Sequence, residues 1–157
     1  IIKQLLMLSV TNRDKFYNYS SGSGQSITMY GSLVTKTNGF QSHLISNEVK
    51  AGPLANVIPL KNWPNSSERT YSFLTPEYNI VHYNFNCNFS VNEKTNINIV
   101  GKNILVTKVK EECKNEDLNF ENFYWSDDDG FIWKSKQWVS LKNIFMEIYI
   151  IKPVTDF

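Results

Sequence analysis

The stretch HYNFNCNFSV, residues 82–91, decides the fold because apolar and polar side chains alternate along it. Its odd positions carry apolar side chains: Tyr83, Phe85, Cys87, Phe89 and Val91. Asparagine or serine fills the even positions between them. Successive side chains of a β-strand point to opposite faces of the sheet. The stretch therefore predicts an antiparallel strand with one face in water and one buried face, which holds Cys87.

A period of two residues also governs most of the remaining chain. It predicts nine further strands, at 4–10, 15–20, 26–30, 32–37, 96–100, 103–110, 120–125, 130–140 and 143–152. Gly31 and Gly101 lie between neighbouring predicted strands, where glycine supplies the positive φ of a tight hairpin. The sequence therefore predicts an all-β single domain over residues 1–157. We expect an antiparallel barrel or sandwich of about ten short strands, with little helix.

Residues 47–65 interrupt this alternation, because they contain three prolines and a glycine. Proline cannot donate to a strand ladder and is rare inside sheets. We expect a long proline-containing connection here, with one helical turn near the PLANVI stretch at 53–58.

Composition limits the possible functions. The net charge is +1, from 16 basic and 15 acidic residues, which argues against a dedicated nucleic-acid-binding protein. No stretch approaches the roughly 20 consecutive apolar residues that a transmembrane helix needs. The first ten residues, IIKQLLMLSV, lack an initiator Met and are followed by no small-residue cleavage site. We therefore expect an upstream segment to be missing from this sequence.

The chain has two cysteines, Cys87 and Cys113. Their spacing fits no zinc motif, and no further ligand lies near them in the sequence. Two interpretations remain open at this point: a disulfide in an exported protein, or two buried thiols.

The acidic run Asp127, Asp128 and Asp129 lies within NFYWSDDDGFIWKSKQW, residues 122–138. A calcium loop of the EF-hand type needs oxygen ligands at positions 1, 3 and 5, glycine at 6 and glutamate at 12. With Gly130 at position 6, position 1 is Trp125 and position 12 is Lys136. Two decisive ligands are absent, so the run is better interpreted as a solvated hairpin tip.

Acid–base catalysis is also disfavoured at this run. Glycoside hydrolysis needs two carboxyl groups in unlike environments across a cleft, whereas these carboxylates share one wet turn. A hydrolase that uses Asp127 or Asp129 is kept as an alternative. The two histidines lack the nucleophile-elbow motif of a Ser–His–Asp triad. No catalytic residue, metal site or cofactor is therefore predicted.

Aromatic residues flank the acidic run. On the strand after it, Trp133 shares a face with Ser135 and Gln137, and we expect Trp133 to point inward. Trp138 falls on the other face, at its lid or edge. Tryptophan at a wet surface can stack on a sugar ring. Trp138 and the three aspartates are thus the predicted contacts with a partner or glycan.

Two blocks of this sequence resemble the YjbF/GfcB family of group 4 capsule polysaccharide lipoproteins. The first block comprises ENFYWSDDDGFIWKSKQWVS and the following MEIYIIKPV. Its matching residues are Asn122, Tyr124, Trp125, Gly130, Trp133, Ser135, Gln137, Lys152 and Pro153. The second block is the hairpin SITMYGSLVTKTNGF, with Gly31, Leu33, Val34, Gly39 and Phe40. The resemblance covers residues 5–153. The loop SLKN replaces the proline-rich loop that usually precedes the family's last strand.

The resemblance implies a mostly β, non-catalytic accessory lipoprotein of capsule or exopolysaccharide secretion in Gram-negative bacteria. Its implied partners are polysaccharide secretion proteins or the polysaccharide itself. The implied location is the periplasm, at the outer membrane. The membrane would be reached only through a lipid anchor upstream of residue 1. Export also makes a Cys87–Cys113 bridge more plausible, if their strands lie close together. The alternative is a small-ligand- or carbohydrate-binding β-barrel without a role in export.

Overall fold

The computed structural model of the chain describes residues 5–11, 16–40, 43–51 and 63–153. The strands, in chain order, are β1 (Met7–Thr11), β2 (Phe16–Ser20), β3 (Ser26–Tyr30), β4 (Leu33–Asn38), β5 (Leu44–Ala51), β6 (Ser66–Leu74), β7 (Ile80–Ile99), β8 (Lys102–Lys114), β9 (Asn119–Ser126), β10 (Ile132–Ser140) and β11 (Ile144–Tyr149). The described residues contain no helix long and apolar enough to cross a bilayer. The predicted all-β class is confirmed.

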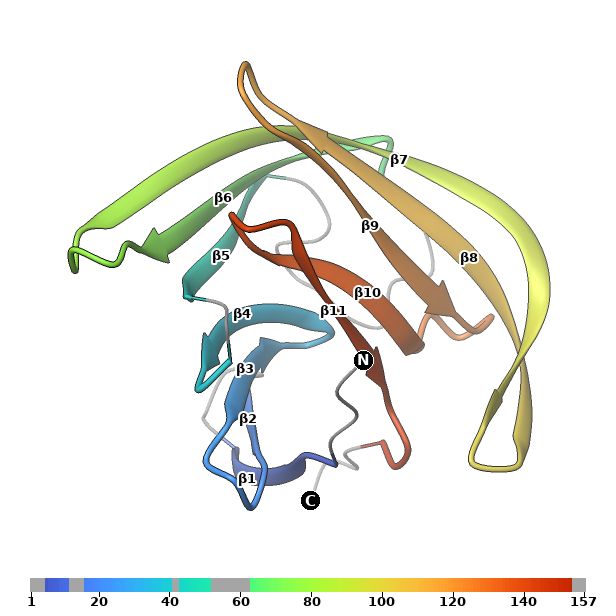
Figure 1. The fold of residues 1–157 in the computed structure, drawn as a ribbon. Coiled ribbons are helices and arrows are strands. Elements are labelled where there is room, and N and C mark those ends of the chain that lie inside the picture. The colour runs from blue at the N-terminus through green and yellow to red at the C-terminus, as the bar shows by residue number, and fades with distance from the viewer. Residues whose placement is uncertain (1–4, 12–15, 41–42, 52–62, 154–157) are drawn as a thin grey trace.

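The strands form two antiparallel sheets that together make a half-barrel (Figure 1). The small sheet has the order β1-β2-β3-β4, and the large sheet has the order β11-β10-β9-β8-β7-β6-β5. Strands adjacent in sequence are adjacent within each sheet, so hairpins make most of the connections. The large sheet curves over the small one, and the β7–β8 hairpin projects beyond it (Figure 1).

The predicted tight turns lie where the glycines indicate. Gly31 has φ +56° in the turn between β3 and β4. Val100 and Gly101 have φ +49° and +81° between β7 and β8. Two consecutive residues with positive φ make the type I′ turn that suits the twist of paired strands.

Strand boundaries differ from the sequence predictions in three places. The predicted strands at 82–91 and 96–100 form one long strand, β7, whose pairing with β8 shifts register between Val91 and Lys94. Residues 90–96 of this strand are exposed, Val91 among them, and Ile99 at its end is buried. Two strands, β5 and β6, were not predicted. The predicted connection at 47–65 is therefore wrong for residues 47–51, which belong to β5. The helical turn expected at 53–58 lies outside the described residues.

An aromatic cluster fills the inner face of the large sheet. Its stacked centre is Phe120 on β9 and Trp138 on β10, whose ring centroids are 4.2 Å apart. Tyr71, Phe73 and Phe85 meet the Trp138 ring at centroid distances of 5.2, 5.2 and 5.7 Å. All of these rings are buried. Burial of each such side chain contributes roughly 1.5–3 kcal/mol, so this cluster is a main source of the sheet's stability.

Side chains from the large sheet bind strand β4, which is an edge strand of the small sheet. Gln137 on β10 accepts a hydrogen bond from the Val34 amide (3.0 Å) and donates one to the Ser32 carbonyl (2.7 Å). Asn47 on β5 donates to the Val34 carbonyl at 3.0 Å. Both backbone groups of Val34 are thereby satisfied by side chains of the other sheet.

Candidate functional site

The interior of the large sheet contains a buried ion pair. Arg69 on β6 and Glu111 on β8 flank β7, and their inward side chains meet at 2.8 Å. Neither side chain is exposed to solvent. A charge that is removed from water needs an opposite charge and a full set of hydrogen bonds, so the surrounding residues decide whether this pair is stable.

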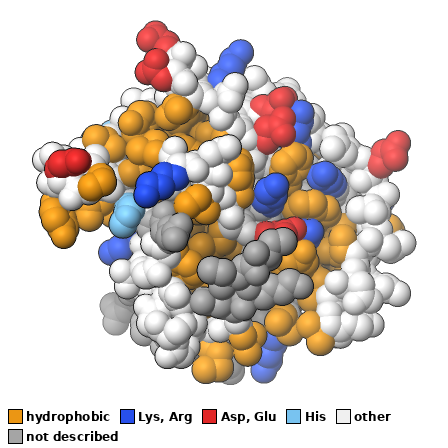
Figure 2. Space-filling view, viewed as in Figure 1, with side chains coloured by type: hydrophobic (Ala, Val, Ile, Leu, Met, Phe, Trp, Pro, Cys, Tyr) orange, Lys and Arg blue, Asp and Glu red, His pale blue; other side chains and the backbone are white. Residues whose placement is uncertain are grey.

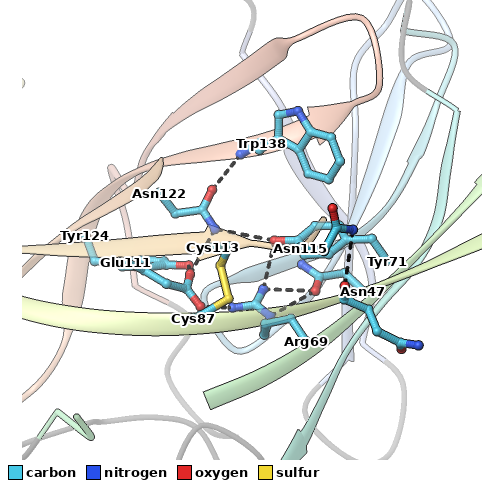
Figure 3. Close-up of a disulfide and its surroundings, with 11 residues drawn as sticks. Asn47, Arg69, Tyr71, Cys87, Glu111, Cys113, Asn115, Asn122, Tyr124 and Trp138 are labelled. Carbon is cyan, nitrogen blue, oxygen red and sulfur yellow. Dashed lines mark hydrogen bonds and ion pairs between the residues drawn. A yellow bond between two sulfur atoms is a disulfide. The ribbon is translucent and has the colours of Figure 1, made fainter. Parts of the chain in front are cut away.

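Four polar side chains complete the buried cluster (Figure 3). Asn47 accepts hydrogen bonds from Nε and Nη2 of Arg69, at 3.2 and 2.9 Å. The Tyr71 hydroxyl accepts another from Nη2, at 3.2 Å. The second carboxylate oxygen of Glu111 accepts from Asn122 at 2.9 Å and from the Tyr124 hydroxyl at 2.8 Å. Every nitrogen of the guanidinium and both oxygens of the carboxylate thus have at least one hydrogen-bond partner.

The cluster holds fixed protonation states. Burial opposes the charge on Arg69, but the adjacent Glu111 carboxylate and the tyrosines hold the pKa of the guanidinium above its ordinary value. Burial raises the pKa of Tyr71 and, further, that of Tyr124, to which the Glu111 charge adds. A catalytic acid or base must reach a substrate. Since these groups are enclosed and bonded to one another, the cluster acts as a structural element.

A disulfide borders the cluster. Cys87 and Cys113 face each other in the β7–β8 ladder, with Cα atoms 4.0 Å apart, and their sulfur atoms are bonded (Figure 3). One carboxylate oxygen of Glu111 lies within 4.8 Å of both sulfurs, which gives a donor set of metal-binding composition. Both sulfurs are used in the disulfide, and both Glu111 oxygens accept hydrogen bonds. These donors therefore serve the fold.

The predicted acidic tip is a hairpin in which Asp127 organises the turn. One oxygen of Asp127 accepts hydrogen bonds from the amides of Asp129 and Phe131, at 3.0 and 2.9 Å. Its other oxygen accepts from Nε1 of Trp133 at 2.8 Å. Gly130 supplies a φ of +86°. Asp127 thus has the role of a turn residue that bonds its own backbone.

The other two aspartates of the tip point into solvent. Asp128 pairs with Lys94 of β7 at 2.7 Å, and both side chains are more than half exposed. Asp129 is also exposed. The three carboxylates therefore have different surroundings, and these two remain accessible to a partner.

The structure places two tryptophans differently from the predictions. Trp138, the predicted surface contact, is only 4% exposed and lies in the aromatic core. That prediction is wrong because the β9–β10 ladder ends at Lys136, and the Trp138 amide donates to the Asn122 side chain instead. Alternation is lost here, and the four consecutive residues Gln137 to Ser140 are all buried. Trp133, expected inward, is only partly buried.

On the outer face of the large sheet, lysine side chains lie over the aromatic rings. Lys108, Trp125, Lys134 and Tyr149 stand in one row across β8 to β11. Both lysines lie over the Trp125 ring, at 5.4 and 4.5 Å from its centroid. Such cation–π pairs use the ring face that a sugar would stack on. Lysine and arginine side chains lie apart from one another on the face shown in Figure 2, without one continuous basic area.

A polar hollow lies on the outer face of the small sheet, opposite the buried side chains of Ile27 and Met29. Its volume is about 600 Å³. Across β2, β3 and β4 the register sets side chains side by side in two rows. The rows are Asn18, Thr28 and Lys36, then Ser20, Ser26 and Asn38. Within the first row, the Thr28 hydroxyl donates to Asn18 at 2.6 Å.

Sequence reasoning missed the residues of the hollow and of the buried cluster. The hollow had a readable signal, since small polar side chains recur every second residue in 18–20 and 26–28. The buried cluster had no such signal, because in the sequence an inward-pointing arginine and an inward-pointing glutamate cannot be distinguished from ordinary surface charges. Asn47, a third member, fell within the predicted connection.

Comparison with known proteins gives the family. None of the curated proteins matches the chain. The crystal structure of the hypothetical lipoprotein YmcC from Escherichia coli (K12) is similar, with a TM-score of 0.80 and 19% identity. The alignment covers 97% of this chain and 78% of that one, and at this identity it shows the fold alone. Residues 2–151 match the family model described as group 4 capsule polysaccharide lipoprotein GfcB, YjbF. Because that match spans nearly the whole sequence, the chain belongs to the YjbF family of group 4 capsule polysaccharide lipoproteins.

Proposed function

We propose that the protein is a non-catalytic, exported accessory lipoprotein of capsule or exopolysaccharide secretion. It binds either a protein of the secretion machinery or the polysaccharide itself. The observation that carries this proposal is the family match over residues 2–151, together with the family's description as a capsule polysaccharide lipoprotein. The proposed location is the periplasm at the outer membrane, reached through a lipid anchor on an upstream segment.

The bonding of the carboxylates supports a non-catalytic role. Asp127 uses both oxygens within its own turn, and Glu111 is enclosed by its partners. A general acid in glycoside hydrolysis needs a second carboxylate across a cleft and a raised pKa. The Cys87–Cys113 disulfide supports export, because disulfides persist in oxidising compartments such as the periplasm.

Deletion of the gene in its own host tests the function. We expect less polysaccharide on the cell surface and in the medium, with the intracellular precursor pool unchanged or raised. The full-length gene supplied in trans should restore secretion. Normal secretion in the deletion strain would overturn the proposal.

Incubation of the purified protein with the secreted polysaccharide tests the absence of catalysis. We expect no release of new reducing ends. A release that Asp127→Ala or Asp129→Ala abolishes would instead support the hydrolase alternative.

The alternative of a small-ligand- or carbohydrate-binding β-barrel without a role in export makes a different prediction. Its apolar ligand would need space among the inner aromatic rings, where Phe120, Trp138 and their neighbours contact one another. Ligand sites are concave and open to their ligand. The contacts within this cluster favour a packed core. Among the described residues, the polar hollow on the small sheet is a concave surface outside that core.

A further inference from the structure

The polar hollow on the small sheet offers hydrogen-bonding groups that the fold does not use. Within the described part of the chain, the side chains of Ser20, Ser26 and Asn38 form no hydrogen bond. Hydroxyl and amide groups both donate and accept, and so do the hydroxyls of a sugar. A row of such groups on a rigid sheet can therefore bind a saccharide with little loss of side-chain freedom.

The charge of the hollow selects among saccharides. Of the described residues that line it, Lys36 is the one charged side chain, and it is exposed. Neither a hydrogen bond nor an ion pair occupies its ammonium group within the described residues. A lysine ammonium pairs with a carboxylate or phosphate. The hollow thus favours an acidic sugar over a neutral one.

An aromatic pair extends the same face. Phe16 and Tyr30 are paired in register one row beyond Asn18 and Thr28, so their side chains point to the same side as the polar rows. Their ring centroids are 4.8 Å apart, and Phe16 is 38% exposed. The apolar face of a sugar ring packs well on such rings. Three rows along a strand span about 13 Å, which is enough for more than one sugar ring.

We propose that the outer face of β2, β3 and β4 binds a short segment of an acidic polysaccharide. Lys36 pairs with the acidic group, the polar rows bind the hydroxyls, and the Phe16–Tyr30 pair packs against a sugar ring. The inference rests on the proposed function in one respect, namely that the ligand is the polysaccharide which the protein helps to secrete.

The test uses the purified chain labelled with ¹⁵N and fragments of the polysaccharide secreted by its own host, prepared by mild acid hydrolysis. We expect amide shift changes confined to β2, β3 and β4. Isothermal titration should show roughly three- to tenfold weaker binding for Lys36→Gln. Phe16→Ala should weaken binding roughly threefold. Raised salt should weaken the wild type and have little effect on Lys36→Gln.

Lys94→Gln is the matched control, because it removes an exposed lysine from the far end of β7 and should bind like the wild type. Thermal unfolding of each variant checks that the fold is kept. Shift changes on another face, absence of binding, or wild-type affinity of both Lys36→Gln and Phe16→Ala would overturn the site. A protein of the secretion machinery that binds here in place of the polysaccharide would also overturn it.

The two proposals can fail separately. If deletion of the gene reduces secretion but the fragments do not bind this face, the function stands and the site falls. If the fragments bind this face but the deletion strain secretes normally, the site stands and the function falls.

Discussion

Two of the ion pairs among the described residues have nearly equal lengths but opposite surroundings. Arg69 and Glu111 meet at 2.8 Å with neither side chain exposed. Lys94 and Asp128 meet at 2.7 Å with side chains 53% and 74% exposed. The first pair is hydrogen-bonded by tyrosines and asparagines, and the second joins the β7–β8 hairpin to the acidic tip. Their distances are alike, so distance cannot tell what each contributes.

Solvation makes the difference between the two pairs. Water screens an exposed pair and already solvates its separated charges, so such pairs contribute about 0–1 kcal/mol. A buried pair lacks that solvation. Removal of one of its partners leaves the other charge with neither water nor a counter-ion around it. The buried pair is therefore a condition for the fold, whereas the exposed pair is nearly dispensable. Variants of the two pairs and of the groups around them therefore test this contrast.

Removal of the buried cation should have the largest effect. Arg69→Met leaves the Glu111 carboxylate unpaired in the interior, and we expect a loss of about 3–5 kcal/mol in the free energy of unfolding. Urea denaturation at neutral pH measures it. The double variant Arg69→Met/Glu111→Leu should recover a large part of the loss, because no charge remains buried. Lys94→Met is the matched control, and an equal loss in both single variants would contradict the contrast.

Removal of the disulfide should come next. Cys87 and Cys113 are 26 residues apart, and a loop of that size implies a stabilisation of about 3–4 kcal/mol by chain entropy. The double variant Cys87→Ala/Cys113→Ala should unfold at correspondingly lower urea concentration. A reducing agent should lower the wild-type midpoint and leave that of the variant unchanged. Equal sensitivity of both proteins to reductant would count against the bridge.

Alkaline pH should weaken the buried cluster. Burial raises the pKa of Tyr71 and Tyr124 above the ordinary value of 10.0. The folded state therefore retains protons that the unfolded state releases. The contribution of these two tyrosines to the free energy of unfolding is complete below about pH 10. It is lost as the pH rises toward their folded-state pKa, by at most about 1.4 kcal/mol per pH unit for each residue. Urea midpoints across this range measure the slope.

Two phenylalanine variants separate this effect from general alkaline damage. Tyr124→Phe should show a shallower fall in stability above pH 10, because one titrating group is gone. Tyr78→Phe removes an 84% exposed tyrosine and should keep the wild-type slope. Identical slopes in all three proteins would exclude the buried tyrosines as the cause.

The acidic tip should divide into one structural and two dispensable carboxylates. Asp127→Ala removes three hydrogen bonds of the turn, and we expect a loss of about 1–3 kcal/mol with a change in Trp133 fluorescence. Asp129→Ala changes an exposed residue and should stay within about 0.5 kcal/mol. A loss shared equally by both variants would show that net charge matters at this tip, not hydrogen bonding.

The exposed pair should show the smallest effect. Lys94→Ala is expected to change the free energy of unfolding by about 0–1 kcal/mol, and added salt should abolish the difference. A loss that persists at high salt would mean that Lys94 has a role beyond its charge.

Alternation predicted the strands whose inward side chains are apolar and failed where they are polar. The strand around Phe85 and Cys87 was predicted correctly because one of its faces is apolar and the other is polar. Strands β5 and β6 were missed because Asn47 and Arg69 point inward, where the pattern expects apolar residues. Trp138 was misplaced because the interrupted ladder after Lys136 changes which face it occupies. Local pattern cannot show such an event, since its cause is the distant Asn122 side chain.

The acidic tip and the buried cluster also differ in how far the sequence alone could predict them. The acidic run was recognised as a hairpin tip from three aspartates and a glycine, because turn chemistry is local. The buried cluster depends on which strands become neighbours, and its members come from β5, β6, β8 and β9. The family resemblance was readable because each of its two blocks is a nearly continuous stretch of sequence. One block runs from β9 to the residues after β11, and the other spans the β3–β4 hairpin.

The hydrogen bonds from Gln137 and Asn47 to the Val34 backbone have a consequence for self-association of the protein. An edge strand with unpaired backbone groups is a template on which another chain can add a strand. Strand β4 is such an edge in the small sheet. At Val34 the backbone amide and carbonyl already form hydrogen bonds with the amide side chains of Gln137 and Asn47, as they would with a neighbouring strand. Gln137 and Asn47, which join the two sheets, therefore also leave no backbone group of Val34 open to an added strand.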